Sequence, residues 1–298
     1  MKSIDTLIPD IYQLIRDKED GWFTDELAKH LSDNLTNRLR GSLGAKRYRP
    51  SIRMSSLGPK CPRALWYSLH RPETAEKFTP WAEIKFAYGH VLEGFILTLA
   101  KAAGHEVTGE QDALEFDGVI GHRDAVIDGV TTDVKSATSL SFQKFKTTNF
   151  GMVDSFGYLD QLDGYILAAA NDPLVRDKRM GTLLAVDKTL GHLTLYKHRC
   201  SDQRRENLRE RIKYYRSIEA RESPPECECI TEKQANGNIK LGWKAGYGEY
   251  KWECFPKLRA CKYSGGITYF AKVVKWPKSS KDGRYLPELD RDGNTIYH

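Results

Sequence analysis

The chain has 298 residues, of which 40% are hydrophobic and 29% are charged, and its formal net charge is +6. These values are ordinary for a soluble globular protein and leave room for one large domain or two small ones. No apolar run approaches the length of a membrane helix, and the N-terminus lacks the apolar core of a signal peptide. We therefore expect a cytoplasmic protein whose basic excess suits a polyanionic partner.

The N-terminal region predicts a helical extension. Thr24 can cap a helix in which leucine recurs at every fourth residue from Leu27 to Leu39. A connector rich in glycine, proline and arginine follows over residues 41–59. We expect residues 1–60 to form a helical and basic extension that packs on the core.

Basic and aromatic side chains alternate between residues 46 and 67. The cluster comprises Lys46, Arg47, Tyr48, Arg49, Arg53, Lys60, Arg63, Trp66 and Tyr67. Cations interleaved with aromatic rings suit a nucleic-acid backbone with stacked bases. An ordinary solvated basic face is the alternative.

A long helix is predicted over residues 80–104, because proline suits its first turn and glycine the residue after its end. His90 and Glu93 are three positions apart and therefore share a face of this helix. Gly89, in mid-helix, costs about 1 kcal/mol relative to alanine, which indicates a close approach by another group. Polar groups on one face of an otherwise apolar helix point either to solvent or to a site.

Residues 121–137 predict a β-hairpin. Asp128-Gly129 is a strong signal for a type I′ turn, which needs a positive φ at both central residues. The resulting register sets Ala125 opposite Thr132.

The same register places two carboxylates face to face, on Asp124 and Asp133. Like charges in directly opposed positions destabilise a sheet, and a divalent cation between them is the simplest reason for their presence. Lys135 lies two residues after Asp133 and therefore on the same face. Two carboxylates and a lysine on one sheet face suit phosphodiester cleavage. An exposed hairpin with ordinary surface charges is the alternative.

The remaining elements complete an α/β pattern with a mixed central sheet between helices. Strands are predicted over residues 106–116, 181–186 and 192–197, and helices over residues 154–170 and 203–222. Residues 139–153 are predicted to form a polar loop that contacts substrate.

The six cysteines are Cys61, Cys200, Cys227, Cys229, Cys254 and Cys261. Disulfides are not expected in a cytosolic protein. Four of the six lie in the last quarter of the chain, and such clustering indicates a metal or iron–sulfur centre. Cys200, at the end of a predicted strand, is expected to be a packed or free thiol.

Four motifs, in order, resemble those of RecB-type nucleases of the PD-(D/E)XK superfamily, over about residues 61–261. The motifs are Gly89 with Glu93, Gly121-His122-Arg123-Asp124, Asp133-Val134-Lys135 and Gln161-Leu162-Asp163-Gly164-Tyr165. Each motif alone is weak, but all four fall on the expected helix, strands and helix. The match is closest to the phage and CRISPR-associated branch, and it implies a restriction-endonuclease-like core.

The resemblance implies a metal site for Mg²⁺ or Mn²⁺, whose preferred ligands are oxygens. Glu93, Asp124 and Asp133 would bind the metal, with the carbonyl of Val134 as a further ligand. His90 could reach the metal beside Glu93, or it could be a packed or solvent-facing side chain.

The resemblance also assigns roles around the metal. Lys135 would position or activate the attacking water and stabilise the pentacovalent phosphate. Gln161 and Tyr165 would hold the DNA strand beside the metal ions.

In the branch that the chain resembles, one cysteine precedes the first motif and three follow the last. Cys61 matches the leading position, but the trailing pattern departs from the family, because Cys254 and Cys261 are separated by six residues with no cysteine between them. The resemblance implies a [4Fe–4S] cluster held by Cys61, either Cys227 or Cys229, Cys254 and Cys261. A structural Zn²⁺ on the same ligands and unligated thiols are the alternatives.

The predicted organisation has four parts. They are the extension over residues 1–60, a nuclease core over residues 61–222, a cysteine-rich segment over residues 223–275 and a polar tail over residues 276–298. The expected function is a metal-dependent DNA exonuclease in recombination, repair or phage DNA processing, beside a helicase or annealing protein. A structure-selective or single-strand endonuclease is one alternative, and a non-catalytic DNA-binding module that keeps the fold is another.

Overall fold

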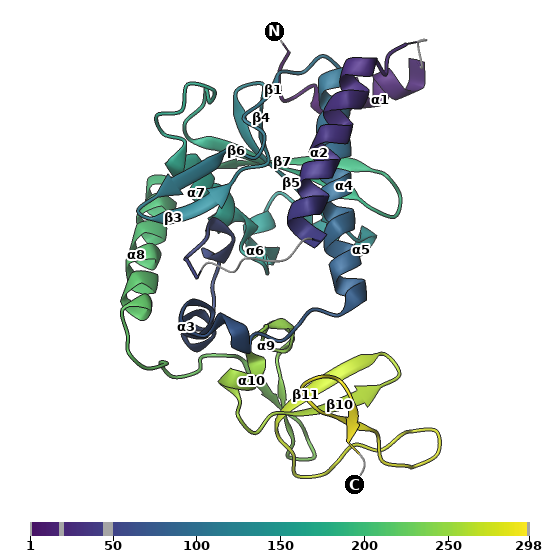
Figure 1. Ribbon diagram of the computed structural model, residues 1–298, viewed down its shortest axis with the longest axis vertical. Helices are drawn as coiled ribbons and strands as arrows, with labels where there is room; N and C mark the ends of the chain where they lie inside the picture. Colours follow the sequence, from purple (N-terminus) through teal and green to yellow (C-terminus); the bar gives the residue numbers. More distant parts are fainter. Residues whose placement is uncertain (1, 18–20, 44–49, 297–298) are drawn as a thin grey trace. The chain divides into compact units, whose positions relative to one another are not determined.

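The computed structural model describes residues 2–17, 21–43 and 50–296 and divides the chain into two compact units (Figure 1). The first unit comprises Met1–Pro59 and Thr79–Lys213, and the second comprises Lys60–Phe78 and Tyr214–His298. Each unit is discontinuous in sequence, whereas the predicted boundaries divide the chain into consecutive segments. Four members of the basic cluster, residues 46–49, lie outside the described residues.

The first unit contains a five-stranded mixed sheet in the order β1-β4-β5-β6-β7 and a separate two-stranded sheet of β2 and β3. The pair β5 and β6 is parallel, and the other pairs of the larger sheet are antiparallel. Its strands are β1 (Val107–Thr108), β2 (Ala113–Phe116), β3 (Val119–His122), β4 (Ala125–Ile127), β5 (Val130–Ala137), β6 (Met180–Asp187) and β7 (Leu193–Arg199). The predicted mixed sheet between helices is confirmed.

Helices cover both faces of this sheet. The helices of the first unit are α1 (Leu7–Asp17), α2 (Asp25–Leu43), α4 (Pro80–Ala102), α5 (Ser139–Phe145), α6 (Phe150–Val153), α7 (Tyr158–Ala168) and the start of α8 (Asp202–Glu219), with a 3-10 turn, η1, at Met54–Ser56. Alternate residues of β6 show the two faces: Leu184 packs with α1 and α4, and Leu183 packs with α5, α6 and α7.

The N-terminal helices form part of the first unit. Thr24 caps α2 by accepting a hydrogen bond from the amide of Leu27 at 3.3 Å. Ile4, Leu7 and Ile11 are buried in the same cluster as the C-terminal half of α4. Helix α2 runs beside α4 in both ribbon views.

Two predictions between residues 106 and 153 are wrong. The predicted strand over residues 106–116 is interrupted, because Gln111 has φ 58° and turns the chain between β1 and β2. The predicted polar loop over residues 139–153 contains α5 and α6. Its aromatic side chains Phe142, Phe145 and Phe150 are buried against β6, so burial of these rings outweighs the polar residues between them.

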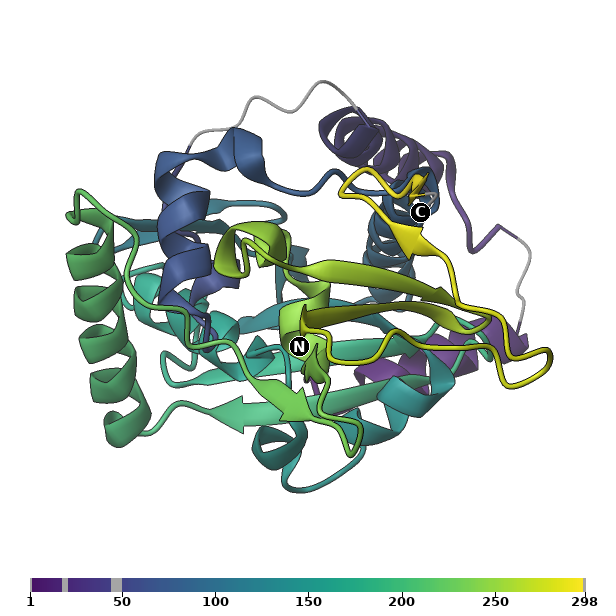
Figure 2. The same ribbon diagram turned by 90° about the horizontal axis from the view of Figure 1, so that it is seen from below.

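The second unit is built on a six-stranded antiparallel sheet in the order β13-β12-β10-β11-β9-β8. Its strands are β8 (Thr231–Lys233), β9 (Ile239–Leu241), β10 (Arg259–Tyr263), β11 (Gly266–Lys272), β12 (Glu288–Leu289) and β13 (Thr295–Ile296). Strands β10 and β11 form its longest pair (Figure 2). The last two strands lie in residues 276–298, which the sequence suggests as a polar tail.

Short helices accompany this sheet. They are α3 (Pro62–His70), the 3-10 turn η2 (Pro72–Thr74), α9 (Trp243–Tyr247), α10 (Lys251–Cys254) and the end of α8. Among the described residues, no helix combines the length and apolar character that a membrane crossing requires.

Candidate active site

The hairpin at the centre of the site has the predicted turn and register. Asp128 and Gly129 have φ values of 47° and 76°, and Ala125 pairs with Thr132. Val130 and Val134 of β5 pack in the same hydrophobic cluster as the C-terminal half of α4. Asp133 and Lys135 lie an odd number of residues from these valines, so they face the opposite side of the sheet.

The predicted cross-strand pair of Asp124 and Asp133 is not formed as a ladder pair, because β4 begins only at Ala125. The buried Arg123 holds the chain outside the ladder through ion pairs with Asp112, at 2.6 Å, and with Asp172. Asp124 nevertheless reaches β5: its Oδ2 accepts a hydrogen bond from the amide of Val134 at 2.7 Å. The carboxyl therefore lies beside Asp133 by a different route from the predicted one.

Glu93 joins this group from α4. A Cβ atom placed at Gly89 would lie 3.5 Å from Ser136 Oγ, an ordinary van der Waals contact, so α4 passes close to β5 one turn before Glu93 without requiring glycine there. Glu93 is buried and forms an ion pair with the buried Arg38 of α2. His90 Nδ1 lies 3.8 Å from Glu93 Oε2, and the His90 side chain is 42% exposed, so it is the solvent-facing member of the pair.

The carboxyl of Asp124 lies between those of Glu93 and Asp133. Burial, together with the charges of Glu93 and Asp133, raises the pKa of Asp124 well above its ordinary value. Burial also raises the pKa of Asp133, which Lys135 partly offsets. Burial alone would raise the pKa of Glu93 as well, but His90, Asp124 and Arg38 hold it below the ordinary value. The site thus concentrates more negative charge than its neighbours neutralise.

Lys135 is the cation of this face. Its Nζ lies 2.6 Å from Asp133 Oδ2, and the two side chains form an ion pair. Burial alone would lower the pKa of Lys135, but Asp133 and Asp124 raise it above its ordinary value. Lys135 therefore stays charged at neutral pH.

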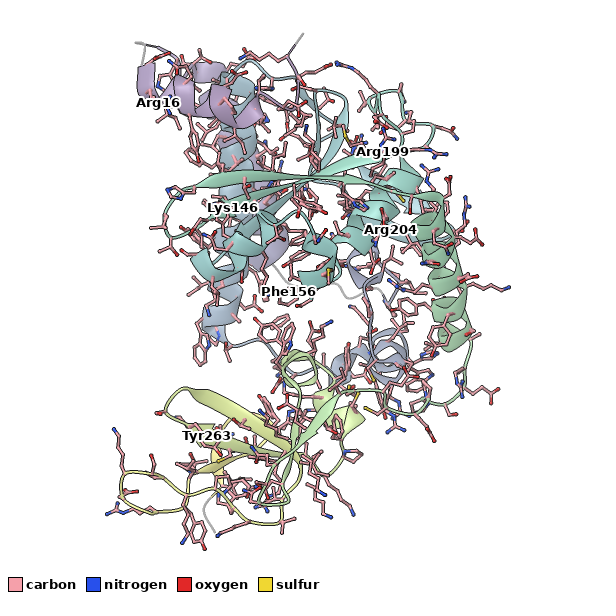
Figure 3. All side chains as sticks on the ribbon, turned by 180° about the vertical axis from the view of Figure 1, so that it is seen from behind. Arg16, Lys146, Phe156, Arg199, Arg204 and Tyr263 are labelled. Atoms are coloured by element: carbon pink, nitrogen blue, oxygen red, sulfur yellow. The ribbon has the colours of Figure 1, made fainter. Side chains whose placement is uncertain are left out.

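Helix α7 supports Lys135 with polar and aromatic groups. Lys135 Nζ donates to Gln161 Oε1 at 3.3 Å and lies 4.9 Å from the centre of the Tyr158 ring. Phe156, labelled in Figure 3, stacks on Tyr158 with ring centres 5.6 Å apart. The Tyr158 ring therefore contacts the lysine ammonium on one side and Phe156 on another.

Tyr165, which is predicted to hold the DNA strand together with Gln161, is only 3% exposed. Its hydroxyl donates to the carbonyl of His122 at 2.8 Å and accepts from Gln161 Nε2 at 3.1 Å. Tyr165 therefore orients Gln161 and supports the chain just before Asp124.

Two residues near the carboxylates carry no motif and are not predicted from the sequence. The Gln111 amide donates to Glu93 at 3.1 Å and to Asp124 at 3.4 Å, and the left-handed backbone of Gln111 aims it there. Arg38 approaches Glu93 from α2. The leucine periodicity of α2 predicts which face packs, but no spacing pattern links Arg38 or Gln111 to Glu93.

The donor set fits a hard divalent cation, because the three acidic side chains that converge here, Glu93, Asp124 and Asp133, offer carboxylate oxygens. Asp133 Oδ2 is buried, and its charged neighbour is the Lys135 ammonium at 2.6 Å. A divalent cation would offset the mutual repulsion of the three carboxylates.

Four cysteines of the second unit converge at another position. The thiols of Cys61, Cys227, Cys229 and Cys254 have Sγ atoms that all lie within 4.8 Å of one another. Both Cys227 and Cys229 take part, whereas the sequence predicts only one of them.

The prediction that Cys261 belongs to this group is not supported by the structure. Cys261 is buried on β10, where it pairs with Thr268 of β11 and Glu288 of β12, so the strand ladder fixes it away from the other thiols. Cys200 is buried among α7 and β6, as expected for a packed thiol, and burial raises its pKa to about 12.

No protein-family model matches the sequence, and no curated protein matches it. Solved structures that resemble it include an alkaline exonuclease from Laribacter hongkongensis, with 12% identity, a TM-score of 0.42 and coverage of 63% of this chain and 93% of that chain. A phage-related exonuclease from Haemophilus somnus 129PT has 14% identity and a TM-score of 0.43, and the match covers 58% of this chain and 94% of that chain. The Laribacter enzyme in complex with dAMP has 12% identity and a TM-score of 0.40, and the match covers 63% of this chain and 93% of that chain.

Proposed function

We propose that this protein is a Mg²⁺- or Mn²⁺-dependent DNA nuclease of the RecB type, acting as an exonuclease on DNA ends. The observation that carries the proposal is the convergence of Glu93, Asp124 and Asp133, with the Lys135 ammonium in contact with Asp133. Helix α4 supplies Glu93, strand β5 supplies Asp133, and Asp124 directly precedes strand β4. Glu93 and Asp133 are buried.

Phosphodiester hydrolysis needs an activated water and compensation of charge on the phosphate oxygens, and one or two bound divalent ions supply both. Glu93, Asp124, Asp133 and the carbonyl of Val134 would hold the metal. Lys135, charged and held by Gln161 and Tyr158, donates to the attacking water and to the phosphate as negative charge develops. Tyr165 keeps Gln161 in place.

Cleavage of end-labelled DNA in Mg²⁺ tests the proposal. We expect linear DNA to be shortened from its ends and closed circles to persist. Degradation of closed circular single strands would replace the exonuclease assignment with an endonuclease one. The size of the labelled product would also give the polarity of cleavage.

Alanine variants separate catalysis from binding. Lys135→Ala should lower the cleavage rate by about 10²–10⁴-fold, the usual contribution of a proton-transfer group, while DNA binding stays measurable. Asp133→Ala should abolish cleavage. If the wild-type protein hydrolyses no DNA in Mg²⁺ or Mn²⁺ yet binds it, the chain is a DNA-binding module that keeps the fold.

The cellular setting forms part of the proposal. A nuclease that acts on DNA ends suits recombination, repair or phage DNA processing, beside a helicase or an annealing protein. Pull-down from cells that carry a defined substrate DNA would identify such a partner.

A further inference from the structure

The four-cysteine group is built from three segments that are far apart in sequence. Cys61 precedes α3, Cys227 and Cys229 follow α8, and Cys254 ends α10. Hydrogen bonds fix these segments around the thiols: Arg63 Nε donates to the carbonyl of Pro225 at 2.7 Å. The Trp66 indole likewise donates to the carbonyl of Arg221 at 2.9 Å.

The separations between the thiols limit what they can hold. Cys61 Sγ lies 3.8 Å from Cys227 Sγ and 4.0 Å from Cys254 Sγ, and all four sulfurs lie within 4.8 Å of one another. A disulfide has an S–S length of about 2.05 Å, so these contacts are between separate thiols. Four sulfurs about 2.3 Å from one tetrahedral ion lie about 3.8 Å from each other, which matches the two measured separations.

A [4Fe–4S] cluster needs a wider arrangement. Each of its four thiolates binds a different iron at a corner of the cube and points outward from that corner. The sulfurs of such a site must therefore lie farther apart than sulfurs that share a single ion. The four thiols present here do not fit the iron–sulfur cluster that the family resemblance implies.

We propose that Cys61, Cys227, Cys229 and Cys254 bind one tetrahedral Zn²⁺ and that Cys261 is not a ligand. Backbone donors support two of the proposed ligands: the amide of Ala64 donates to the sulfur of Cys61, and the amide of Cys229 donates to that of Cys227. Amide donors of this kind orient and stabilise thiolate ligands. The ion would add a further link between residues 60–78 and residues 214–298, beside the hydrogen bonds from Arg63 and Trp66.

Metal analysis of the full chain tests which ion the four cysteines bind. Protein purified anaerobically from cells supplied with both iron and zinc should contain about one zinc per chain and little iron, and it should be colourless. Incubation with Fe²⁺ and sulfide should add no broad visible absorbance. Replacement of zinc by Co²⁺ should give the intense visible bands of tetrahedral cobalt bound to thiolates.

Cysteine variants identify the ligands. Cys229→Ser should lower the zinc content severalfold and shift the Co²⁺ spectrum, whereas Cys261→Ser should keep one zinc per chain and the same spectrum. Cys200→Ser is a second matched control, because that thiol is buried in the first unit.

Three results would overturn the proposal. They are about four irons per chain with brown colour, a metal-free protein with oxidised thiols, and a Cys261→Ser variant that loses zinc as Cys229→Ser does. These measurements need no DNA, so their outcome is independent of the nuclease assignment.

Discussion

At the residue scale, the buried Arg38 decides the charge balance around Glu93. The Arg38 side chain is 6% exposed, and its Nε and Nη2 atoms have no hydrogen-bond partner among the described residues, so its contact with Glu93 is its main compensation. A buried guanidinium is costly to desolvate, and we expect its ion pair to hold the Glu93 carboxylate, the proposed metal ligand, in place.

Arg38→Ala should lower DNA cleavage by about 10–100-fold, the usual effect of removing a group that orients a metal ligand. The apparent Mg²⁺ requirement should rise with it, because Glu93 loses its orienting partner. Arg40→Ala, on an exposed position of the same helix, is the matched control and should leave both quantities unchanged. Equal activity of the two variants would show that Glu93 does not depend on Arg38.

The sequence identifies Glu93, Asp124, Asp133 and Lys135, because these residues lie in ordered motifs. It does not identify Arg38 or Gln111, because both reach the site through tertiary contacts that leave no spacing pattern. Tyr165 shows a third case: the motif predicts its position, but burial against His122 gives it a supporting role.

At the element scale, hydrogen bonds attach the turn of the hairpin to the segment that follows α4. Asp128 Oδ2 lies 2.7 Å from His105 Nδ1, and Asp128 Oδ1 accepts from the amide of Glu106 at 3.1 Å. These contacts join the turn to the chain that follows α4. They therefore hold α4, which carries Glu93, in a fixed position relative to the hairpin, which carries Asp133 and Lys135.

Asp128→Ala should reduce the free energy of unfolding by about 2 kcal/mol, because it leaves a buried histidine and a backbone amide without this acceptor. Urea denaturation followed by circular dichroism measures the change. Asp33→Ala removes only an exposed ion pair with Lys29 and should change stability by less than about 0.5 kcal/mol. If Asp128→Ala lowers the free energy of unfolding no more than Asp33→Ala does, the anchoring role of Asp128 is contradicted.

Local turn chemistry made this hairpin predictable, because Asp-Gly favours positive φ in both positions. The start of β4 was not predictable in the same way. It depends on Arg123, whose partners Asp112 and Asp172 lie on other segments. The helices α5 and α6 were missed because their buried aromatic residues are separated by polar ones.

At the scale of the whole molecule, the order of elements predicts the mixed sheet and its helical layers, because a parallel strand pair needs a helical crossover. The order does not predict the two discontinuous units. Residues 60–78 group with the C-terminal part of the chain through contacts such as Arg63 with Pro225 and through the four-cysteine group. Such long-range contacts are not encoded in any local pattern.

The proposed mechanism requires that carboxylates of the first unit bind a divalent cation. Titration of Mn²⁺, followed by the loss of its free electron paramagnetic resonance signal, measures this binding directly. We predict that the wild-type protein binds Mn²⁺, that Asp124→Asn lowers its affinity at least tenfold, and that Asp202→Asn, at an exposed position, leaves it unchanged. Equal Mn²⁺ binding by wild-type and Asp124→Asn proteins would contradict the account.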